Sequence, residues 1–366
     1  MTDMKPWAFE LEEYIREGEP DRARRAELWQ VAIGLQDVDG LTPSQYLLDT
    51  AKEHIEGELS IDQVQSRIAA YYQQRDERTQ AELESEEADV VSSRIAEILG
   101  ERAFTFSPSE LKSIHGLFKG LLKEAGAYRR YNITKNEWVL KGDTVRYSSW
   151  NIVPETLEYD FEKEGAFSYQ GLSKLEVTRH IAAFASGIWQ IHPFCEGNTR
   201  TTAVFIIKYL NAMGLEIGNG PFADHSWYFR NALVRANYTN LDQDVHETNR
   251  YLEAFFENAL LGASHDLKNR YLHIDWVGDV NATGDGEMHI PQVAPQVTPQ
   301  VAPVTEEKIL EFCSVPRSRA ELLEYLKLSD RKNLRTKYLN PLLASGKLKM
   351  TIPDKPNSRL QKYVRA

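Results

Sequence analysis

The chain has 366 residues, of which 42% are hydrophobic and 27% are charged. This length allows a sizeable core and two or three domains. The net charge of −11 argues against non-specific binding of the whole molecule to nucleic acids or anionic membranes.

The cysteine content and the hydropathy of the chain predict its cellular setting. Cys195 and Cys313 lie in different predicted regions, so they form neither a disulfide framework nor a metal-binding cysteine pair. No stretch approaches the roughly 18 consecutive apolar residues of a membrane-spanning helix, and no apolar signal segment follows the first residues. We therefore expect a soluble protein of the reducing cytoplasm, without a membrane partner.

Residues 1–75 predict an N-terminal helical domain. Pro20 suits the first turn of a helix, apolar residues follow it at helical spacing, and Gly40 is expected as a left-handed C-terminal cap. Thr42-Pro43 is predicted to open the next helix, and a capping box that begins at Ser60 opens a third.

Residues 91–265 predict a larger helical block with one interruption. A capping box at Ser107 begins one helix, and apolar periodicity continues on either side of a polar loop near residue 192. Between these helices, residues 138–140 and 144–147 are β-prone runs joined by a glycine turn, which predicts a hairpin.

The C-terminal part of the chain begins with a repeat. Within the predicted linker, residues 280–304, Pro-Gln-Val begins at residues 291, 295 and 299, a pattern typical of an extended, semi-rigid linker. Residues 305–366 then predict helices over 306–312, 319–326 and 331–343, followed by two strands. We interpret this order as a small winged-helix domain. The whole chain is thus expected to be mainly α-helical.

The C-terminal domain differs in charge from the rest. Residues 305–366 contain 14 Lys or Arg against seven Asp or Glu, so the remainder of the chain carries a formal charge of −18. Four cations lie on or near the predicted third helix, where a DNA-reading helix would expose them: Arg331, Lys332, Arg335 and Lys337. The alternatives are DNA binding and a solvated basic face that binds protein or adds solubility.

The loop His-Pro-Phe-Cys-Glu-Gly-Asn-Thr-Arg, residues 192–200, is the main functional signal. It combines a proton acceptor, His192, with an oxygen ligand, Glu196, and a cation, Arg200. An apolar helical run follows it directly, so its backbone N–H groups lie at the positive end of a helix dipole, where phosphate binds. These features together suggest chemistry on a nucleotide.

This loop resembles the signature of the Fic (Fido) family of AMP transferases, His-x-Phe-x-Asp/Glu-Gly-Asn-x-Arg-x-x-Arg. Six of the seven specified positions match. The resemblance extends over roughly residues 95–265 and implies a helical Fic core with the hairpin as a flap beside the site. In the family the flap aligns a target segment by strand addition. An ordinary structural hairpin is the alternative.

The resemblance implies a role for each residue of the loop. His192 would accept the proton of an attacking Ser, Thr or Tyr hydroxyl, and Glu196 would bind Mg²⁺. Phosphate contacts are expected from the remaining residues of the loop: Gly197, Asn198, Thr199 and Arg200. The implied reaction is transfer of AMP from Mg-ATP to a protein hydroxyl.

The seventh position holds Ala203 in place of the second arginine. In the family that arginine binds the γ-phosphate of ATP, and its loss removes a charge-assisted contact worth roughly 1.5–3 kcal/mol. Weak or altered activity is therefore expected. Two alternatives remain open: transfer or removal of a different nucleotide, and a DNA-binding regulator whose Fic domain senses a nucleotide.

The segment that ends at Asp39 and Gly40 is similar to the inhibitory helix of the small antitoxins that partner Fic toxins. The strict inhibitory pattern is absent, because Leu35 and Asp39 stand where Ser and Glu are expected. The partner expected for Asp39 is Ala203. We therefore interpret residues 1–75 as a fused antitoxin-like domain with a mainly structural role. The sequence is also compatible with a homodimer.

Overall fold

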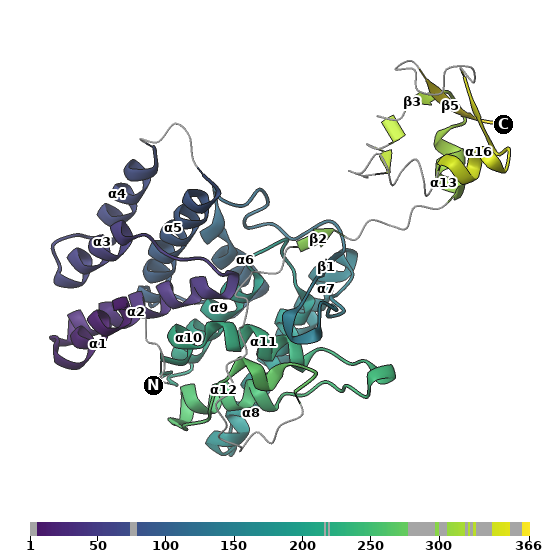
Figure 1. The fold of residues 1–366 in the computed structure, drawn as a ribbon. Coiled ribbons are helices and arrows are strands. Elements are labelled where there is room, and N and C mark those ends of the chain that lie inside the picture. The colour runs from purple at the N-terminus through teal and green to yellow at the C-terminus, as the bar shows by residue number, and fades with distance from the viewer. Residues whose placement is uncertain are drawn as a thin grey trace. The chain divides into compact units, whose positions relative to one another are not determined.

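The computed structural model describes residues 6–73, 79–215, 217–218, 220–276, 297–299, 306–318, 321–322, 325–326, 339–351 and 361–366. The chain divides into two compact units, Met1–Pro299 and Gln300–Ala366 (Figure 1). The fold is mainly helical, which confirms the expected fold class. Within the described part of the chain, no helix combines the length and the hydrophobicity that crossing a bilayer requires.

The first unit is built from α-helices, short 3-10 helices (η) and two short strands. Its α-helices are α1 (Pro6–Glu17), α2 (Pro20–Gly34), α3 (Gln45–Glu56), α4 (Ile61–Gln73), α5 (Gln80–Gly100), α6 (Pro108–His115), α7 (Val153–Gly165), α8 (Lys174–Ile191), α9 (Asn198–Ala212), α10 (Gly220–Asp224), α11 (Ser226–Ala236) and α12 (Arg250–Leu261). Its 3-10 helices are η1 (Leu35–Asp39), η2 (Gly116–Phe118), η3 (Trp138–Leu140), η4 (Trp150–Ile152), η5 (Leu241–Gln243) and η6 (Asn269–Leu272), and its strands are β1 (Ile133–Lys135) and β2 (Val297–Pro299).

Local sequence signals explain the helix ends in the N-terminal region. Pro20 begins α2, and Gly40 caps η1 in the left-handed conformation with φ 71°. The prediction that Thr42-Pro43 opens the next helix is wrong, because Ser44 is the N-cap of α3 and its hydroxyl accepts from the N–H of Leu47. The capping box that begins at Ser60 is confirmed by reciprocal hydrogen bonds with Gln63.

One hydrophobic core runs through the whole first unit. It includes Trp29 of α2, Phe118 of η2, Trp189 of α8 and Phe255 of α12, all buried. Helix α2 packs against α1, α5 and α10, so the N-terminal helices and the helices that follow them are parts of one packed body (Figure 1). The N-terminal helices therefore reach the residues around the polar loop.

The segment predicted as a hairpin folds differently. Residues 138–140 form the 3-10 helix η3, and residues 144–147 have no regular structure. The carbonyl of Glu137 accepts from the N–H groups of both Leu140 and Gly142, which closes a tight turn in place of a strand ladder. The Val139 carbonyl accepts from the N–H of Ile274, which lies outside the predicted hairpin.

A strand forms just before this turn. Strand β1 pairs antiparallel with β2, which comes from the Pro-Gln-Val segment, with Ile133 opposite Pro299 and Lys135 opposite Val297. The rest of the predicted linker, residues 280–296 and 300–304, lies outside the described residues. Part of a segment predicted as a tether is therefore a strand of the first unit.

The second unit contains α13 (Glu306–Phe312), α16 (Asn340–Ala344) and a three-stranded antiparallel sheet in the order β3-β5-β4. Its strands are β3 (Arg317–Ser318), β4 (Leu348–Met350) and β5 (Lys362–Arg365). The expected final pair of strands is confirmed, and the core includes Ile309, Leu342 and Tyr363. Most residues of the second and third predicted helices, 319–326 and 331–343, lie outside the described residues, and so do the four cations near the third helix.

Candidate functional site

The polar loop joins two core helices of the first unit. Helix α8 begins with a complete capping box and ends at Ile191, and α9 begins at Asn198. The Asn198 side chain closes the loop, because its Oδ1 accepts from the Phe194 N–H at 3.0 Å and its Nδ2 donates to the Phe194 carbonyl at 2.9 Å. The buried Asn198 side chain therefore holds the shape of the loop. Its polar atoms are used in this way, so the phosphate contact expected of Asn198 would come from its backbone N–H.

His192 lies at the turn that leaves α8. It has φ 50°, a left-handed conformation that is uncommon outside glycine. Its Nδ1 lies 3.2 Å from the carbonyl of Trp189, which can only accept, so Nδ1 carries the proton and Nε2 carries the lone pair. Nε2 is buried and has no hydrogen-bond partner among the described residues, and the side chain is 1% exposed.

The environment of His192 keeps the ring neutral. Burial, followed by the charge of Lys135, lowers its pKa well below the usual 6.5. The Tyr147 ring covers it at a centroid distance of 4.1 Å. The imidazole is therefore an unprotonated base that is held in one orientation, and its Nε2 has no hydrogen-bond partner among the described residues.

Arg129 holds the backbone on either side of His192. Its Nε donates to the His192 carbonyl at 2.7 Å, and one of its terminal nitrogens donates to the Ile191 carbonyl at 3.2 Å. Its own backbone N–H donates to the carbonyl of Pro193 at 2.9 Å. The buried guanidinium thus satisfies carbonyls that the end of α8 leaves without helical partners.

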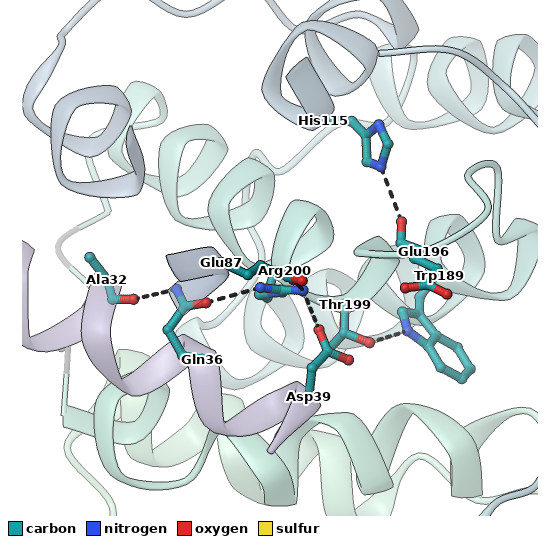
Figure 2. Close-up of polar contacts among 9 residues, drawn as sticks. All are labelled: Ala32, Gln36, Asp39, Glu87, His115, Trp189, Glu196, Thr199 and Arg200. Carbon is teal, nitrogen blue, oxygen red and sulfur yellow. Dashed lines mark hydrogen bonds and ion pairs between the residues drawn. The ribbon is translucent and has the colours of Figure 1, made fainter. Parts of the chain in front are cut away.

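His115 fixes the other side of the loop. Its ring stacks on Phe194 with centroids 3.8 Å apart and an interplanar angle of 2°. Nδ1 accepts from the Gly126 N–H, so Nε2 carries the proton and donates to the carbonyl of Glu196 at 3.0 Å (Figure 2). Burial lowers the pKa of His115 to about 4, which keeps this tautomer neutral.

The first backbone N–H groups of α9 are available to bind an anion. Gly197, with φ 69°, is the N-cap, and a Cβ at this position would lie 2.3 Å from the Phe118 ring. Among the described residues, no acceptor pairs with the backbone N–H of Asn198, Thr199 or Arg200. These N–H groups point along the helix dipole, as a phosphate site requires. The Thr199 hydroxyl is already used, since it accepts from the Trp189 indole at 2.9 Å.

The Arg200 side chain is enclosed by acceptors from other helices. It donates to Gln36 of the segment η1 at 2.9 Å, and it forms ion pairs with Asp39 at 2.7 Å and Glu87 of α5 at 2.6 Å. Figure 2 shows all three side chains converging on the guanidinium. The partner of Asp39 is therefore Arg200 and not position 203, and we call Gln36, Asp39 and Glu87 the Arg200 clasp.

Further charges are buried beside the loop. Glu137 and Arg230 form an ion pair at 2.7 Å, with both side chains nearly inaccessible. Lys135 is 7% exposed, and its pKa is lowered by burial and by Arg230. Ala203 is fully buried in α9, so that helix offers no cation one turn after Arg200.

Glu196 is the exposed residue of the loop. Its carboxylate forms no hydrogen bond or ion pair with another described residue, and the described residues contain no cluster of three groups that could hold a metal ion unaided. Mg²⁺ binds through one or two carboxylates together with substrate phosphates. A single accessible carboxylate beside a phosphate-binding turn fits that requirement.

Several residues of this site were missed from the sequence. Arg129 and His115 act through backbone carbonyls, and Gln36 and Glu87 come from helices distant in the chain. The His115-to-Arg129 stretch contains three glycines and several polar residues between apolar ones, a signal that could have suggested a loop packed on the site. No local pattern singles out Glu87 among its acidic neighbours.

Comparisons with known proteins found two family models and a solved structure. Residues 105–210 match the model of the Fic/DOC family, and residues 307–365 match that of the Filamentation induced by cAMP protein Fic-like, C-terminal domain. No curated protein matches the chain. A crystal structure of a Fic family protein from Desulfovibrio desulfuricans G20 is similar over 99% of this chain and 97% of its own, with 17% sequence identity and a TM-score of 0.38.

Proposed function

Because residues 105–210 form a Fic/DOC family domain followed by a Fic-like C-terminal domain, we propose that the protein transfers AMP from Mg-ATP to a Ser, Thr or Tyr hydroxyl of a target protein or of itself. The observation that carries the proposal is the state of His192. Its Nε2 is a buried lone pair without a partner, next to a helix start with free N–H groups.

The proposed reaction is a single displacement at the α-phosphorus. His192 Nε2 accepts the proton of the target hydroxyl as its oxygen forms a bond to phosphorus. The bond from the α-phosphorus to the oxygen that bridges to the β-phosphate breaks, and pyrophosphate leaves. Because the base is neutral at pH 7, no proton has to be removed from it beforehand.

Charge on the phosphates is balanced by fixed groups. The N–H groups of Asn198 and Thr199 bind phosphate oxygens without having to give up protein partners. Glu196 would hold a magnesium ion, which neutralises phosphate charge when bound. Arg200 would bind a further phosphate of the nucleotide. Because Ala203 replaces the second arginine of the family pattern, the γ-phosphate lacks that cation, and we expect slow transfer.

The described arrangement corresponds to a resting form in this proposal. Asp39 and Glu87 form ion pairs with the Arg200 guanidinium, which a phosphate would have to bind. The Tyr147 ring covers the imidazole of His192. Binding of ATP must therefore break the Arg200 clasp. We propose that the N-terminal helices restrain the enzyme through Arg200, whereas the family pattern uses the second arginine.

Labelling with α-phosphate-labelled ATP and Mg²⁺ tests the proposed activity. We expect the wild-type chain to label itself or a protein mixture slowly, and His192→Ala to lose at least about 100-fold of that rate, as removal of a general base does. Mass spectrometry identifies the added group as AMP. Equal labelling of the two proteins, or labelling by another nucleotide alone, would contradict the proposal.

A further inference from the structure

Lys135 lies on the buried face of an extended segment beside the candidate site. Lys135 and Glu137 are buried, and Asn136 between them is exposed. Glu137 has φ −98° and ψ 123°, so the extended backbone continues to it beyond the end of β1. Successive side chains of an extended segment point to opposite faces, and Lys135 and Glu137 therefore share the inner face.

This inner face is turned toward His192. The Tyr147 hydroxyl donates to the Glu137 carboxylate at 3.3 Å, and the Tyr147 ring covers the His192 imidazole with centroids 4.1 Å apart. The charge of Lys135 acts on the same imidazole, because after burial it is the largest cause of the lowered pKa of His192. Both side chains are nearly inaccessible in the described arrangement, so an opening that admits a substrate to the base also exposes the ammonium.

Lys135 differs from the arginines whose side chains form ion pairs in this part of the site. Arg200 pairs with the carboxylates of the Arg200 clasp, and both terminal nitrogens of Arg230 pair with Glu137, at 2.7 and 2.9 Å. The Lys135 ammonium forms no hydrogen bond or ion pair with any residue that the structure describes, although the residue is only 7% exposed. A buried charge without a partner costs free energy, so a ligand that brings negative charge explains this ammonium.

We propose that Lys135 binds the α-phosphate of the nucleotide and holds it beside Nε2 of His192. This inference rests on the function proposed above, in which the α-phosphorus is the reacting atom and therefore lies next to the base. The ammonium neutralises part of the charge on the non-bridging oxygens of this phosphate, a charge that otherwise repels the attacking hydroxyl oxygen. Lys135 supplies its charge from β1, whereas α9 has an alanine at position 203.

The position of Lys135 determines which nucleotides depend on it. AMP, ADP and ATP all carry an α-phosphate, so each of them would lose the same contact if the ammonium were removed. Adenosine has no phosphate and would lose nothing. A cation placed on the γ-phosphate would affect the binding of ATP alone, and a purely structural lysine would affect none of the phosphates.

Calorimetric titration of the full-length chain with AMP, ADP, ATP and adenosine, in the absence of Mg²⁺, tests this contact without any activity. Lys135→Met keeps the length of the side chain and removes its charge. We expect this variant to bind AMP, ADP and ATP at least about tenfold more weakly than the wild-type chain, by similar factors, because a charge-assisted contact is lost. Adenosine should bind both proteins with the same affinity.

Lys208→Met is the matched control, because Lys208 is another buried lysine, 5% exposed, farther along α9. Its ammonium donates to the carbonyls of Ile98 and Glu101 at 2.8 and 3.0 Å. The control variant leaves these carbonyls without a donor, so its midpoint of urea denaturation should fall while its nucleotide affinities stay at the wild-type values. Lys135→Met removes an unpaired charge, so its midpoint should stay at or above that of the wild-type chain.

Four results would overturn the inference. They are absence of AMP binding by the wild-type chain, equal AMP affinity of Lys135→Met and wild type, a loss of affinity confined to ATP, and a urea midpoint of Lys135→Met that falls as far as that of Lys208→Met. If Lys135→Met does not fold, Lys135→Gln takes its place in the same comparisons.

The two proposals fail in different ways. If the affinities for AMP, ADP and ATP follow the expectation but the wild-type chain does not transfer AMP, then the phosphate contact of Lys135 stands and the transferase activity is wrong. If the wild-type chain transfers AMP through His192 but Lys135→Met binds AMP as the wild type does, then the activity stands and the role of Lys135 is wrong.

Discussion

The guanidinium of Arg200 is paired with three acceptors of the chain, so a phosphate ligand has to displace at least one of them. It lies 2% exposed over the Phe118 ring, and three side chains from the N-terminal half of the chain surround it. Buried charges are stable only when paired, so the clasp is a condition for folding in the absence of phosphate. A phosphate that replaces these carboxylates would also pair the buried charge of Arg200.

Removal of one carboxylate of the clasp should favour nucleotide. We expect Asp39→Asn to bind Mg-ATP at least about tenfold more tightly than the wild-type chain, because a charge-assisted contact of roughly 1.5–3 kcal/mol no longer competes with phosphate. Isothermal titration calorimetry measures the affinity. Asp37→Asn, in the same turn η1, is the control and should leave it unchanged; equal affinities for Asp39→Asn and wild type would show that Arg200 is not a nucleotide contact.

At the scale of elements, the site depends on how α8 ends and α9 begins. The left-handed His192 and the left-handed Gly197 bracket a loop that Asn198 closes by two hydrogen bonds. Together they place the base and the N–H groups of α9 on one short turn. Residues outside these helices hold the turn, with Arg129 on one side and His115 on the other.

Gly197→Ala tests the close contact at the start of α9. A non-glycine residue in the left-handed region costs roughly 1–2 kcal/mol, and the clash with the Phe118 ring adds about 1–3 kcal/mol. Gly171→Ala is the matched control, because Gly171 has φ 83° but no atom within 4 Å of the added Cβ. Urea denaturation should show a larger loss of unfolding free energy for Gly197→Ala, and equal losses would mean that the ring moves aside without cost.

At the scale of the whole molecule, one core ties the N-terminal helices to the helices of the site. The Asp39 and Glu87 side chains reach Arg200 only because α2 and α5 pack together and against the rest of the first unit. Restraint of the site and stability of the fold are thus linked. Conditions that weaken this core are expected to release the clasp as well.

Stability should fall as the pH is lowered from about 6.5 toward 4. His115 is neutral in the folded state down to its pKa of about 4, whereas in the unfolded chain it binds a proton below about 6.5. In this window the unfolded state binds more protons, and one such group contributes at most about 1.4 kcal/mol per pH unit. Denaturant titrations should give a shallower loss for His115→Gln than for wild type; identical slopes would contradict the buried neutral ring.

The sequence by itself determined the helical class, the caps at Gly40, Ser60 and Ser107, and the residues of the His192 loop, because capping, periodicity and a nine-residue motif are local properties. Only the tertiary structure decided where Asp39 and Glu87 lie, since ion pairs between distant helices leave no pattern in the chain. It also replaced the predicted hairpin by a turn and placed residues 297–299 on β1, because a strand edge is completed by whichever segment the fold brings to it.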